Sequence, residues 1–499
     1  MADAPSTPTN PPAADGSDSA RKQRAQMEAL LARPAAQSRG HLASTDGPLD
    51  YTVHAAFLPV AGDAASGGEP EAAVLTTAYT LEGADPASRP VCFAFNGGPG
   101  SASIWLHLGA LGPKRVVVPD DGSMAPPPYA VQDNPESWLA FTDLVFIDPP
   151  HTGWSLTAGD AARKKMLSVD GDVAALAEVM RLWLTRHRRW GSPIYLCGES
   201  YGTTRGAALT DKLQGMGIAV SGAILVSLAM DLQSLVFAPA NHLPYALFLP
   251  AFANVAQFHG LLKGPLAASP EAARAAAEAF VDEDYAAALL AGARLDPRRR
   301  STIARRVAEL TGLDRALVEA QDLRISDQTY FMQALRHRGQ VLGRLDARGT
   351  GPLAAQQGHS FEFDPGMEAI VPAYTMAAMG WFSALGLDLD TPYEVLNREV
   401  HKGWNWQRGE SSRNGFASTS ADLALALRRN NRLRVLACSG RYDLGTPYSA
   451  SDWSLAGLDI PVAVRERVTH RYYDAGHMMY TRQADLSQMR ADVAAWMQG

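Results

Sequence analysis

Five short apolar runs restrict the fold of this chain more than any other feature. Each run has the length of a strand that is buried on both faces of a sheet, and helical patterns lie between several of them. One such pattern recurs at steps of three and four residues over 173–184, which gives a helix one apolar face. This alternation predicts an α/β fold with a mostly parallel central sheet. The runs are Val91–Phe95, Leu144–Ile147, Ile194–Cys197, Ala223–Val226 and Leu433–Cys438.

Two parts of the chain depart from this alternation. Residues 1–44 are rich in Pro, Ala, Ser and Asp, which predicts a disordered tail. Residues 231–364 contain no clear buried strand but carry Ala-rich and Arg-rich helical stretches, one of them over 327–348. We therefore expect an α/β core built from 45–230 and 365–499, with 231–364 inserted as a helical cap that contributes to a pocket.

Composition excludes several classes of function. The 499 residues carry a net charge of −7, and 46% of them are hydrophobic, so the chain is a globular protein without the basic excess of a nucleic-acid or membrane-surface binder. No window is apolar enough for a membrane span, and the first residues do not resemble a signal peptide. These patterns predict a cytoplasmic protein that binds neither nucleic acid nor membrane, and they leave the oligomeric state open.

Three cysteines are too few and too scattered for a disulfide framework or a zinc ribbon. Cys92, Cys197 and Cys438 each lie in or at the end of a predicted strand, and the chain has no C-x-x-C pair. We expect them to be small apolar core residues. No H-E-x-x-H motif or other metal-ligand spacing occurs either, so no metal site and no cofactor are predicted.

The strongest catalytic signal follows the third apolar run. Strand 194–197 leads directly into Gly198-Glu199-Ser200-Tyr201-Gly202 and then into a helical segment. A serine in a G-x-S-x-G turn between strand and helix is held on a sharp bend with its Oγ exposed, and the glycines allow the close turn. This context predicts Ser200 as a nucleophile.

A serine nucleophile needs a base and an orienting acid, in the chain order Ser, acid, His for this architecture. Asp443 follows the strand-like run 433–438, and His477 follows a second one at 468–473. Catalytic groups of such sheets gather beyond the carboxyl ends of the strands, which is where both residues are expected. Asp474 is the rival acid, but it lies only three residues before His477.

A glycine-rich loop follows the first apolar run. Asn96-Gly97-Gly98-Pro99-Gly100-Ser101 has the composition of a loop whose backbone N–H groups approach a ligand closely. A phosphate cradle is the other use of such loops, but the G-x-G-x-x-G and G-K-[ST] spacings are absent. The position after an early strand predicts an oxyanion hole formed by the N–H groups of Gly98 and Tyr201.

Taken together, the residues of these motifs and their order along the chain resemble those of the serine carboxypeptidase family. The resemblance implies an α/β-hydrolase fold with an inserted helical cap, a Ser200–His477–Asp443 triad and cleavage of the last peptide bond of a substrate. It also implies that Asn96, Gly97 and Glu199 help to bind the terminal carboxylate. The motifs are Asn96–Ser101, Asn134–Trp138, Asp148–Pro149, Thr152–Ser155, Gly198–Gly202, Asp443 and Gly476–Met478.

One position departs from the family pattern. The family places a second Glu two residues before a Gly-Pro pair, where it shares a proton with the Glu before the nucleophile; here that position is Ala110. Glu199 is thus expected to stand without its acidic partner. His107 lies three residues earlier, and we consider the hypothesis that it binds an anion or meets Glu199, against the simpler interpretation of a helix residue.

The sequence therefore predicts a serine hydrolase that needs no cofactor, acts on a peptide or small acyl substrate, and most resembles a carboxypeptidase. Because Ala110 replaces a Glu that would help to recognise a terminal carboxylate, an esterase or acyltransferase with the same triad remains an alternative. A non-catalytic binding protein is the third possibility, and the complete triad argues against it.

Overall fold

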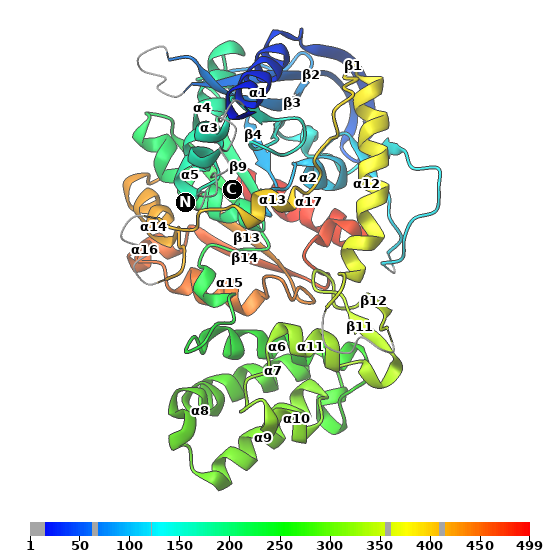
Figure 1. The fold of residues 1–499 in the computed structure, drawn as a ribbon, viewed down its shortest axis with the longest axis vertical. Helices are drawn as coiled ribbons and strands as arrows, with labels where there is room; N and C mark the ends of the chain where they lie inside the picture. Colours follow the sequence, from blue (N-terminus) through cyan, green and yellow to red (C-terminus); the bar gives the residue numbers. More distant parts are fainter. Residues whose placement is uncertain (1–14, 62–67, 121, 355–360, 409–414) are drawn as a thin grey trace, which may run out of the picture.

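A mostly parallel sheet forms the centre of the computed structural model, which describes residues 15–61, 68–120, 122–354, 361–408 and 415–499 (Figure 1). Its strand order is β1-β2-β3-β7-β4-β9-β10-β13-β14, with β8 paired to β3. The strands from β7 to β14 in this order run parallel, and the β1-β2-β3 edge is antiparallel. The bounds are β1 Ala36–Ser44, β2 Gly47–Ala61, β3 Pro70–Leu81, β4 Val91–Phe95, β7 Asp143–Ile147, β8 Leu156–Thr157, β9 Ile194–Glu199, β10 Val220–Val226, β13 Arg434–Gly440 and β14 Val468–Tyr473.

The five predicted runs coincide with β4, β7, β9, β10 and β13, and the predicted α/β fold is confirmed. Strand β4 shows why the runs are continuous. Val91, Phe93 and Phe95 pack into one hydrophobic cluster, whereas Cys92 and Ala94 pack into the cluster on the opposite face. Because helices cover both faces of the sheet, every residue of such a strand is buried and apolar.

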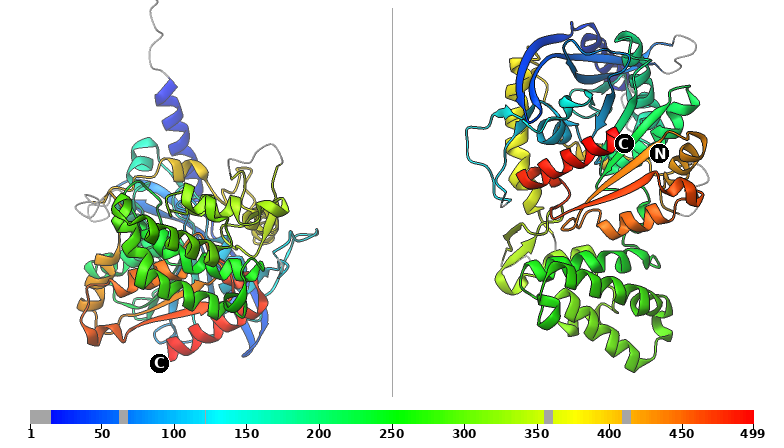
Figure 2. Two further views of the ribbon diagram at one scale, coloured as in Figure 1. Left: turned by 90° about the horizontal axis from the view of Figure 1, so that it is seen from below. Right: turned by 180° about the vertical axis from the view of Figure 1, so that it is seen from behind.

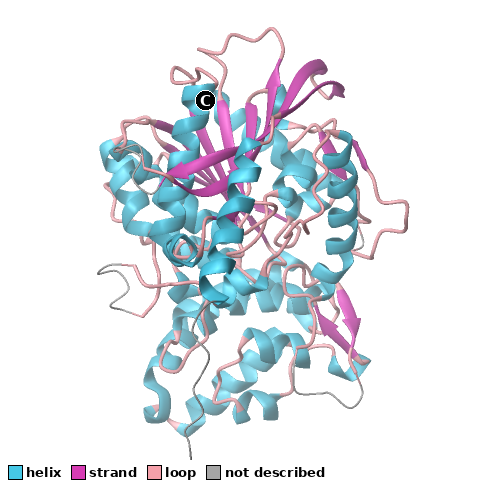
Figure 3. Cartoon of the chain, turned by 45° about the horizontal axis from the view of Figure 1, so that its top comes forward, coloured by secondary structure: helices cyan, strands magenta, loops and turns pink. Residues whose placement is uncertain are grey.

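The covering helices divide between these two clusters, and Figure 3 shows helices flanking the strands. Three of them, α4, α5 and α14, pack with Val91, Phe93 and Phe95, and α12 and α17 belong to the other cluster. The N-cap of α4 is Ser168, whose side chain accepts a hydrogen bond from the N–H of Gly171. The bounds are α4 Val169–Arg186, α5 Tyr201–Gly215, α14 Ser420–Arg429, α12 Pro365–Ala384 and α17 Gln483–Gln498.

Within 231–364, helices α6 to α11 form a lobe at one end of the molecule, seen at the bottom of Figure 1 and in both views of Figure 2. The lobe has its own hydrophobic cluster, which also takes in Tyr442, Leu444 and Tyr448 of the core. The helix predicted over 327–348 is wrong beyond residue 333, because the chain turns there into a short hairpin. The bounds are α6 Leu243–Phe258, α7 Pro270–Phe280, α8 Ala286–Ala291, α9 Pro297–Thr311, α10 Arg315–Ala320, α11 Asp327–Gln333, β11 Gln340–Leu342 and β12 Thr350–Pro352.

The predicted disordered tail over 1–44 is wrong for residues 15–44, and 1–14 lie outside the described residues. Helix α1 spans Asp15–Ala32, and β1 follows it as the edge strand beside β2. Met27 is fully buried, and Leu42 joins the same hydrophobic cluster. The polar composition misled because an edge strand and a surface helix need only a few apolar contacts to be held.

All three cysteines are buried and unpaired in β4, β9 and β13, as expected of core residues. No described helix is both long and apolar enough to cross a membrane.

The remaining short elements lie in the connections between the longer ones. They are α2 Ile104–Leu106, α3 Asp160–Met166, α13 Arg398–Lys402, α15 Tyr448–Ala456, α16 Val462–Arg465, β5 Lys114–Val116 and β6 Val131–Asp133.

Candidate active site

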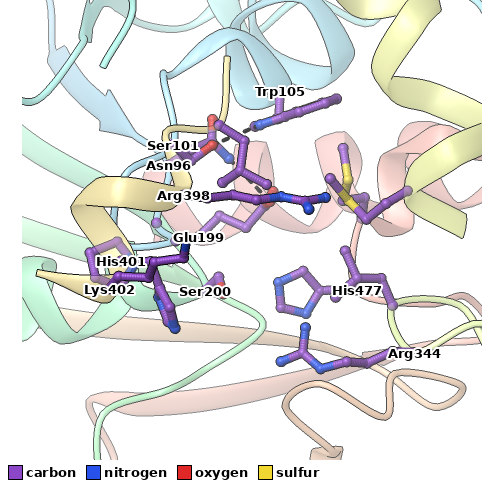
Figure 4. A pocket seen from close by; sticks show the side chains of 17 residues that line it. Asn96, Ser101, Trp105, Glu199, Ser200, Arg344, Arg398, His401, Lys402 and His477 are labelled. Atoms are coloured by element: carbon purple, nitrogen blue, oxygen red, sulfur yellow. Dashed lines mark hydrogen bonds between the residues drawn. The ribbon is translucent and has the colours of Figure 1, made fainter. Parts of the chain in front are cut away.

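The loops after β4, β9 and β14 open onto one cavity of about 380 Å³ (Figure 4). A cavity of this size is in the range of small-molecule and peptide-end sites. The remaining wall comes from the loop after β11, from α12 and from the segment around α13. The lining residues are Asn96, Gly97, Gly98, Pro99, Ser101, Trp105, Glu199, Ser200, Arg344, Leu345, Met367, Leu396, Arg398, His401, Lys402, His477 and Met478.

Ser200 occupies the sharp turn between β9 and α5 that the sequence predicts. Its backbone has φ 59° and ψ −129°, a strained conformation for a residue with a side chain. The flanking glycines make the turn possible, since a Cβ atom at Gly198 would lie 2.2 Å from the Gly202 carbonyl oxygen. The strain places Ser200 at the cavity surface.

Asp443 and His477 meet in the way that the chain order predicts. The His477 Nδ1 lies 2.7 Å from the Asp443 Oδ2, and both side chains are buried. The other carboxylate oxygen accepts the backbone N–H groups of Gly445 at 2.7 Å and Thr446 at 3.0 Å. The Thr446 hydroxyl donates to Asp443 Oδ2 at 2.7 Å and lies 3.3 Å from His477 Nδ1. Asp443 is therefore fixed by four hydrogen bonds and orients the imidazole.

Burial and electrostatic attraction shift the pKa values of Asp443 and His477 in opposite directions, and the attraction has the larger effect. Burial alone raises the pKa of Asp443, but the His477 charge and the hydrogen bonds to Asp443 outweigh it, so this pKa lies below its ordinary value. Burial lowers the pKa of His477, and the Asp443 carboxylate raises it above 6.5. An imidazole with a raised pKa is suited to accept a proton from a hydroxyl group and to release it to an amine.

The rival acid is excluded by its position. The Asp474 side chain is 69% exposed, and its nearest cation is Arg441 at 3.9 Å. Its backbone carbonyl accepts hydrogen bonds from Arg348 and Arg482, and no hydrogen bond or ion pair joins its side chain to His477 among the described residues. Sequence spacing alone left Asp474 open, and the structure leaves Asp443 as the acid beside His477.

The glycine-rich loop packs directly against the turn that holds Ser200. A Cβ atom at Gly97 would lie 2.5 Å from the Tyr201 nitrogen and 2.7 Å from the Glu199 carbonyl oxygen. Gly98 has φ 101°, which favours glycine, and it lines the cavity. Gly97 thus packs against the Tyr201 nitrogen, and Gly98 and Ser200 line the same cavity, an arrangement compatible with the predicted oxyanion hole.

Glu199 is held between two side chains at the base of the cavity. Asn96 Nδ2 donates to one carboxylate oxygen at 3.1 Å, and the Tyr480 hydroxyl donates to the other at 2.5 Å. Asn96 is oriented in turn by the N–H of Leu106, which donates to its Oδ1 at 3.0 Å. Burial raises the pKa of Glu199 from 4.5 to about 7, although His477 and Tyr480 lower it. Sequence reasoning missed Tyr480, because only the fold places it opposite Glu199.

Ala110 lies in the π-helical turn His107–Leu111, which packs beside a side chain that hydrogen-bonds Glu199. The Asn134 amide donates to the carbonyl oxygens of Ala110 and Gly112, both at 2.8 Å, and fixes this turn. A Cβ atom at the neighbouring Gly109 would lie 2.6 Å from the Tyr480 ring. The tyrosine that hydrogen-bonds Glu199 therefore packs beside the turn that would carry the family's second Glu.

The anion-binding role considered for His107 is not supported. Its Nε2 lies 2.6 Å from the Tyr79 hydroxyl, and its ring stacks on Phe146 at 4.3 Å between centroids. Burial lowers the pKa of His107 to about 3, so the ring is neutral. It is absent from the cavity lining, and the side chains that hydrogen-bond Glu199 are Asn96 and Tyr480. His107 is a core residue, which agrees with the simpler interpretation.

Sequence reasoning also missed the basic residues that line the cavity around the predicted triad. Arg398, His401 and Lys402 stand at helical spacing on α13, and Arg344 follows the β11 strand. The basic residues at positions i, i+3 and i+4 were a possible signal, but nothing in the sequence places this short helix beside Ser200. Among the described residues, no group of three or more His, Cys, Asp or Glu side chains is placed to hold a metal ion.

Comparisons with known proteins agree with the motifs. A family model described as serine carboxypeptidase matches residues 78–215, which includes Asn96 and Ser200 and ends before Asp443 and His477. The pheromone-processing carboxypeptidase KEX1 of Yarrowia lipolytica is 27% identical over 215 residues. The resemblance to the serine carboxypeptidases is thereby confirmed. This match covers 42% of the chain, and it spans only 31% of the relative's own length.

A similar solved structure extends the comparison to most of the chain. The prohormone-processing carboxypeptidase KEX1(delta)p of Saccharomyces cerevisiae superposes with a TM-score of 0.54 at 15% identity. The match covers 90% of this chain and 91% of the other. It supports the α/β-hydrolase fold.

Proposed function

We propose that this protein is a serine carboxypeptidase that releases the last residue of a peptide through an acyl-enzyme. The observation that carries the proposal is that one cavity is lined by Ser200, by His477 with Asp443 behind it, and by Asn96 and Glu199. The predicted nucleophile and the groups that the family uses to hold a terminal carboxylate thus line the same cavity.

The reaction divides into two steps. Ser200 Oγ attacks the last peptide carbonyl while His477 Nε2 takes the hydroxyl proton, and the oxyanion is held by the N–H groups of Gly98 and Tyr201. The C–N bond then breaks as His477 passes the proton to the leaving amine, which leaves an acyl ester on Ser200. Water attacks this ester with His477 again as base, which releases the shortened peptide and restores the serine. Asp443 holds the imidazole and stabilises its charged form throughout.

Glu199 governs the pH range in which a terminal carboxylate binds. With a pKa of about 7, its side chain is largely protonated below neutral pH and can donate a hydrogen bond to a carboxylate. Above this pH, its own negative charge opposes that of the substrate. Binding of peptides with a free carboxyl end is therefore expected to weaken as the pH rises through 7.

A specific observation keeps an esterase or acyltransferase as the second candidate. Ala110 stands in place of the family's second carboxylate-binding Glu, and the hydrogen-bond partners of Glu199 among the described residues are Asn96 and Tyr480. Recognition of a terminal carboxylate then rests on fewer groups. A substrate without a carboxylate would still meet the complete triad.

A panel of peptides with free and with amidated carboxyl ends, assayed from pH 5 to 8, separates the two candidates. We expect release of the last residue from the free peptides and little from their amides. Equal cleavage of both forms, or turnover of simple acyl esters alone, would favour the esterase or acyltransferase. The Ser200→Ala variant is the control for contaminating activity. The cytoplasmic location stays a prediction of the sequence, to be tested by cell fractionation.

A further inference from the structure

The cavity beside Ser200 is strongly basic. Four of its lining residues are Arg344, Arg398, His401 and Lys402, and Glu199 is its one acidic lining residue among the residues described. Because burial keeps Glu199 largely protonated below pH 7, it cancels little of the positive charge there. The wall therefore attracts anions beyond what the triad chemistry requires.

Two of these four side chains are already engaged or neutral. Lys402 Nζ lies 2.7 Å from the Glu399 carboxylate, outside the cavity lining. Burial and the nearby Arg344 lower the pKa of His401, although a hydrogen bond with the backbone of Gly98 opposes the shift. The positive charge that is free to meet a ligand is therefore that of the two arginines.

The two guanidinium groups have no anionic partner within the described part of the chain. No ion pair or side-chain hydrogen bond joins Arg398 to another described residue, and its side chain is exposed toward the cavity. Burial raises the pKa of both Asp327 and Asp364, and the charge of Arg344 opposes this rise at each. Neither carboxylate forms an ion pair with the guanidinium, and the Asp364 oxygens accept the backbone N–H groups of Arg344, Leu345 and Gly366.

Both arginines lie near His477 in the cavity. Figure 4 shows the Arg398 side chain on one side of the His477 ring and the Arg344 side chain on the other. A Cβ atom at Gly445, two residues beyond Asp443, would lie 3.4 Å from Arg344 Cζ, so this guanidinium borders the acid loop. Its charge also lowers the pKa of His477, which requires that the two groups are close.

A peptide end supplies one carboxylate, and this cavity offers more than one place for such a group. Asn96, Gly97 and Glu199 line the same cavity as the arginines, so the residue whose terminal carboxylate they hold places its side chain there too. A planar guanidinium binds a carboxylate through two parallel hydrogen bonds and rejects a cation.

Building on the proposed function, we propose that the cavity selects peptides whose last residue is aspartate or glutamate. Arg398 and Arg344 provide the positive charge for the second carboxylate. The apolar part of the wall, from Trp105, Leu345 and Met478, then contacts the methylene groups of that side chain. Neutral last residues bind by their terminal carboxylate alone, and basic ones are repelled.

The test compares N-acetylated tripeptides that differ only in the last residue, which is Glu, Gln or Lys. Binding is measured by calorimetry on the Ser200→Ala protein, and kcat/KM is measured on the unaltered protein. We expect at least about a tenfold preference for Glu over Gln in both assays, with Lys weaker still, and a preference that falls as salt is added. Equal values for Glu and Gln would overturn the inference.

The two arginines are then replaced in turn. Arg398→Gln and Arg344→Gln are each expected to lower the Glu-over-Gln ratio several-fold, and the double variant is expected to bring it near one. Arg432→Gln is the matched control, because Arg432 is exposed just before β13, at the opposite end of that strand from Asp443. An unchanged ratio in the double variant would show that other groups select the side chain.

The two proposals fail in different ways. Binding that prefers Glu, without cleavage of any free peptide, would leave the arginine site intact and would reject the carboxypeptidase activity. Cleavage of all free peptides at equal rates would do the reverse. A preference for Glu at the second-last position instead of the last would contradict the placement of the arginines on the leaving-residue side.

Discussion

The triad and the α13 wall face each other across one cavity, and they are built in opposite ways. Asp443 is fully buried and accepts four hydrogen bonds, and His477 is 3% exposed. Arg398 on the facing wall is exposed, and its side chain forms no ion pair or hydrogen bond with the described residues around it. Asp443 and His477 are thus held in place before a substrate binds, whereas the Arg398 side chain on the facing wall is left available to bind one.

This difference has a physical cause. A proton-transfer group has to be positioned within a few tenths of an ångström, so its hydrogen bonds are satisfied inside the protein. A group that selects substrates gains nothing from an internal partner, because the ion pair would have to break before binding. Substitutions on the two sides should accordingly change different quantities, namely rate at the triad and preference at the wall.

The largest effect on kcat is expected for substitution of Ser200. The Ser200→Ala variant is expected to lose about a million-fold in kcat, because no other group replaces the nucleophile. Labelling by an organophosphonate should disappear in the same variant, and binding of peptides should remain. Substantial labelling of the variant would mean that another residue is the nucleophile.

Asp443→Asn is expected to lower kcat by about ten-thousand-fold, because the amide no longer stabilises the charged imidazole in its correct tautomer. The preference among last residues should stay unchanged, since the arginine wall is untouched. Asp474→Asn is the matched control and should keep its rate, because this side chain is 69% exposed. Steady-state kinetics of both variants with the same peptides makes the comparison.

Glu199 lies between the two regions, and its effect is expected to appear as a pH dependence of stability. Burial raises its pKa from the ordinary value of 4.5 to about 7 in the folded protein, so folding takes up a proton in this interval. Its contribution to stability is complete below pH 4.5 and is lost as the pH rises through 7.

Glu199→Gln removes this titration. The variant is expected to gain stability relative to the unaltered protein between pH 4.5 and 8, by about 3 kcal/mol at most. Urea unfolding of both proteins at each pH measures the difference. Parallel stability curves would show that folding does not raise the pKa of Glu199.

His107→Gln is expected to have the smallest effect on catalysis. KM for free peptides should remain within a factor of about two, because His107 does not line the cavity. The free energy of unfolding should fall by about 1–3 kcal/mol, since the buried contact with Tyr79 is disturbed. His41→Gln, at an exposed position, is the control and should change neither quantity. A clear rise in KM for His107→Gln alone would restore its role in anion binding.

Local patterns predicted which edge of the sheet carries the candidate site, for a definite reason. Ser200 and Asp443 follow buried strands, His477 follows the edge strand β14, and parallel strands bring their carboxyl ends to one edge. Strands can be predicted from short stretches of sequence, so the three residues of the proposed triad could be predicted from the loops that follow them. Tyr480 and Arg344 carry no comparable signal, because their positions depend on how α17 and the inserted lobe pack against the sheet.

The errors of prediction have the same origin. Residues 15–44 look polar and disordered in isolation, and they become ordered only because β2 offers an edge and the core accepts Met27. His107 stands at the right spacing for the anion site, but the π-helical turn and the Phe146 ring direct it into the core. In each case, a contact between distant segments outweighs the local pattern.

The sequence by itself determined the α/β fold, the strand ends that carry Ser200, Asp443 and His477, and the core position of the three cysteines, because burial and period are encoded residue by residue. Only the tertiary structure decided which acid pairs with His477, that Tyr480 holds Glu199, and that two arginines without an internal anionic partner among the described residues line the same cavity as Ser200. Those features arise where segments far apart in the sequence meet, and no local pattern records such meetings.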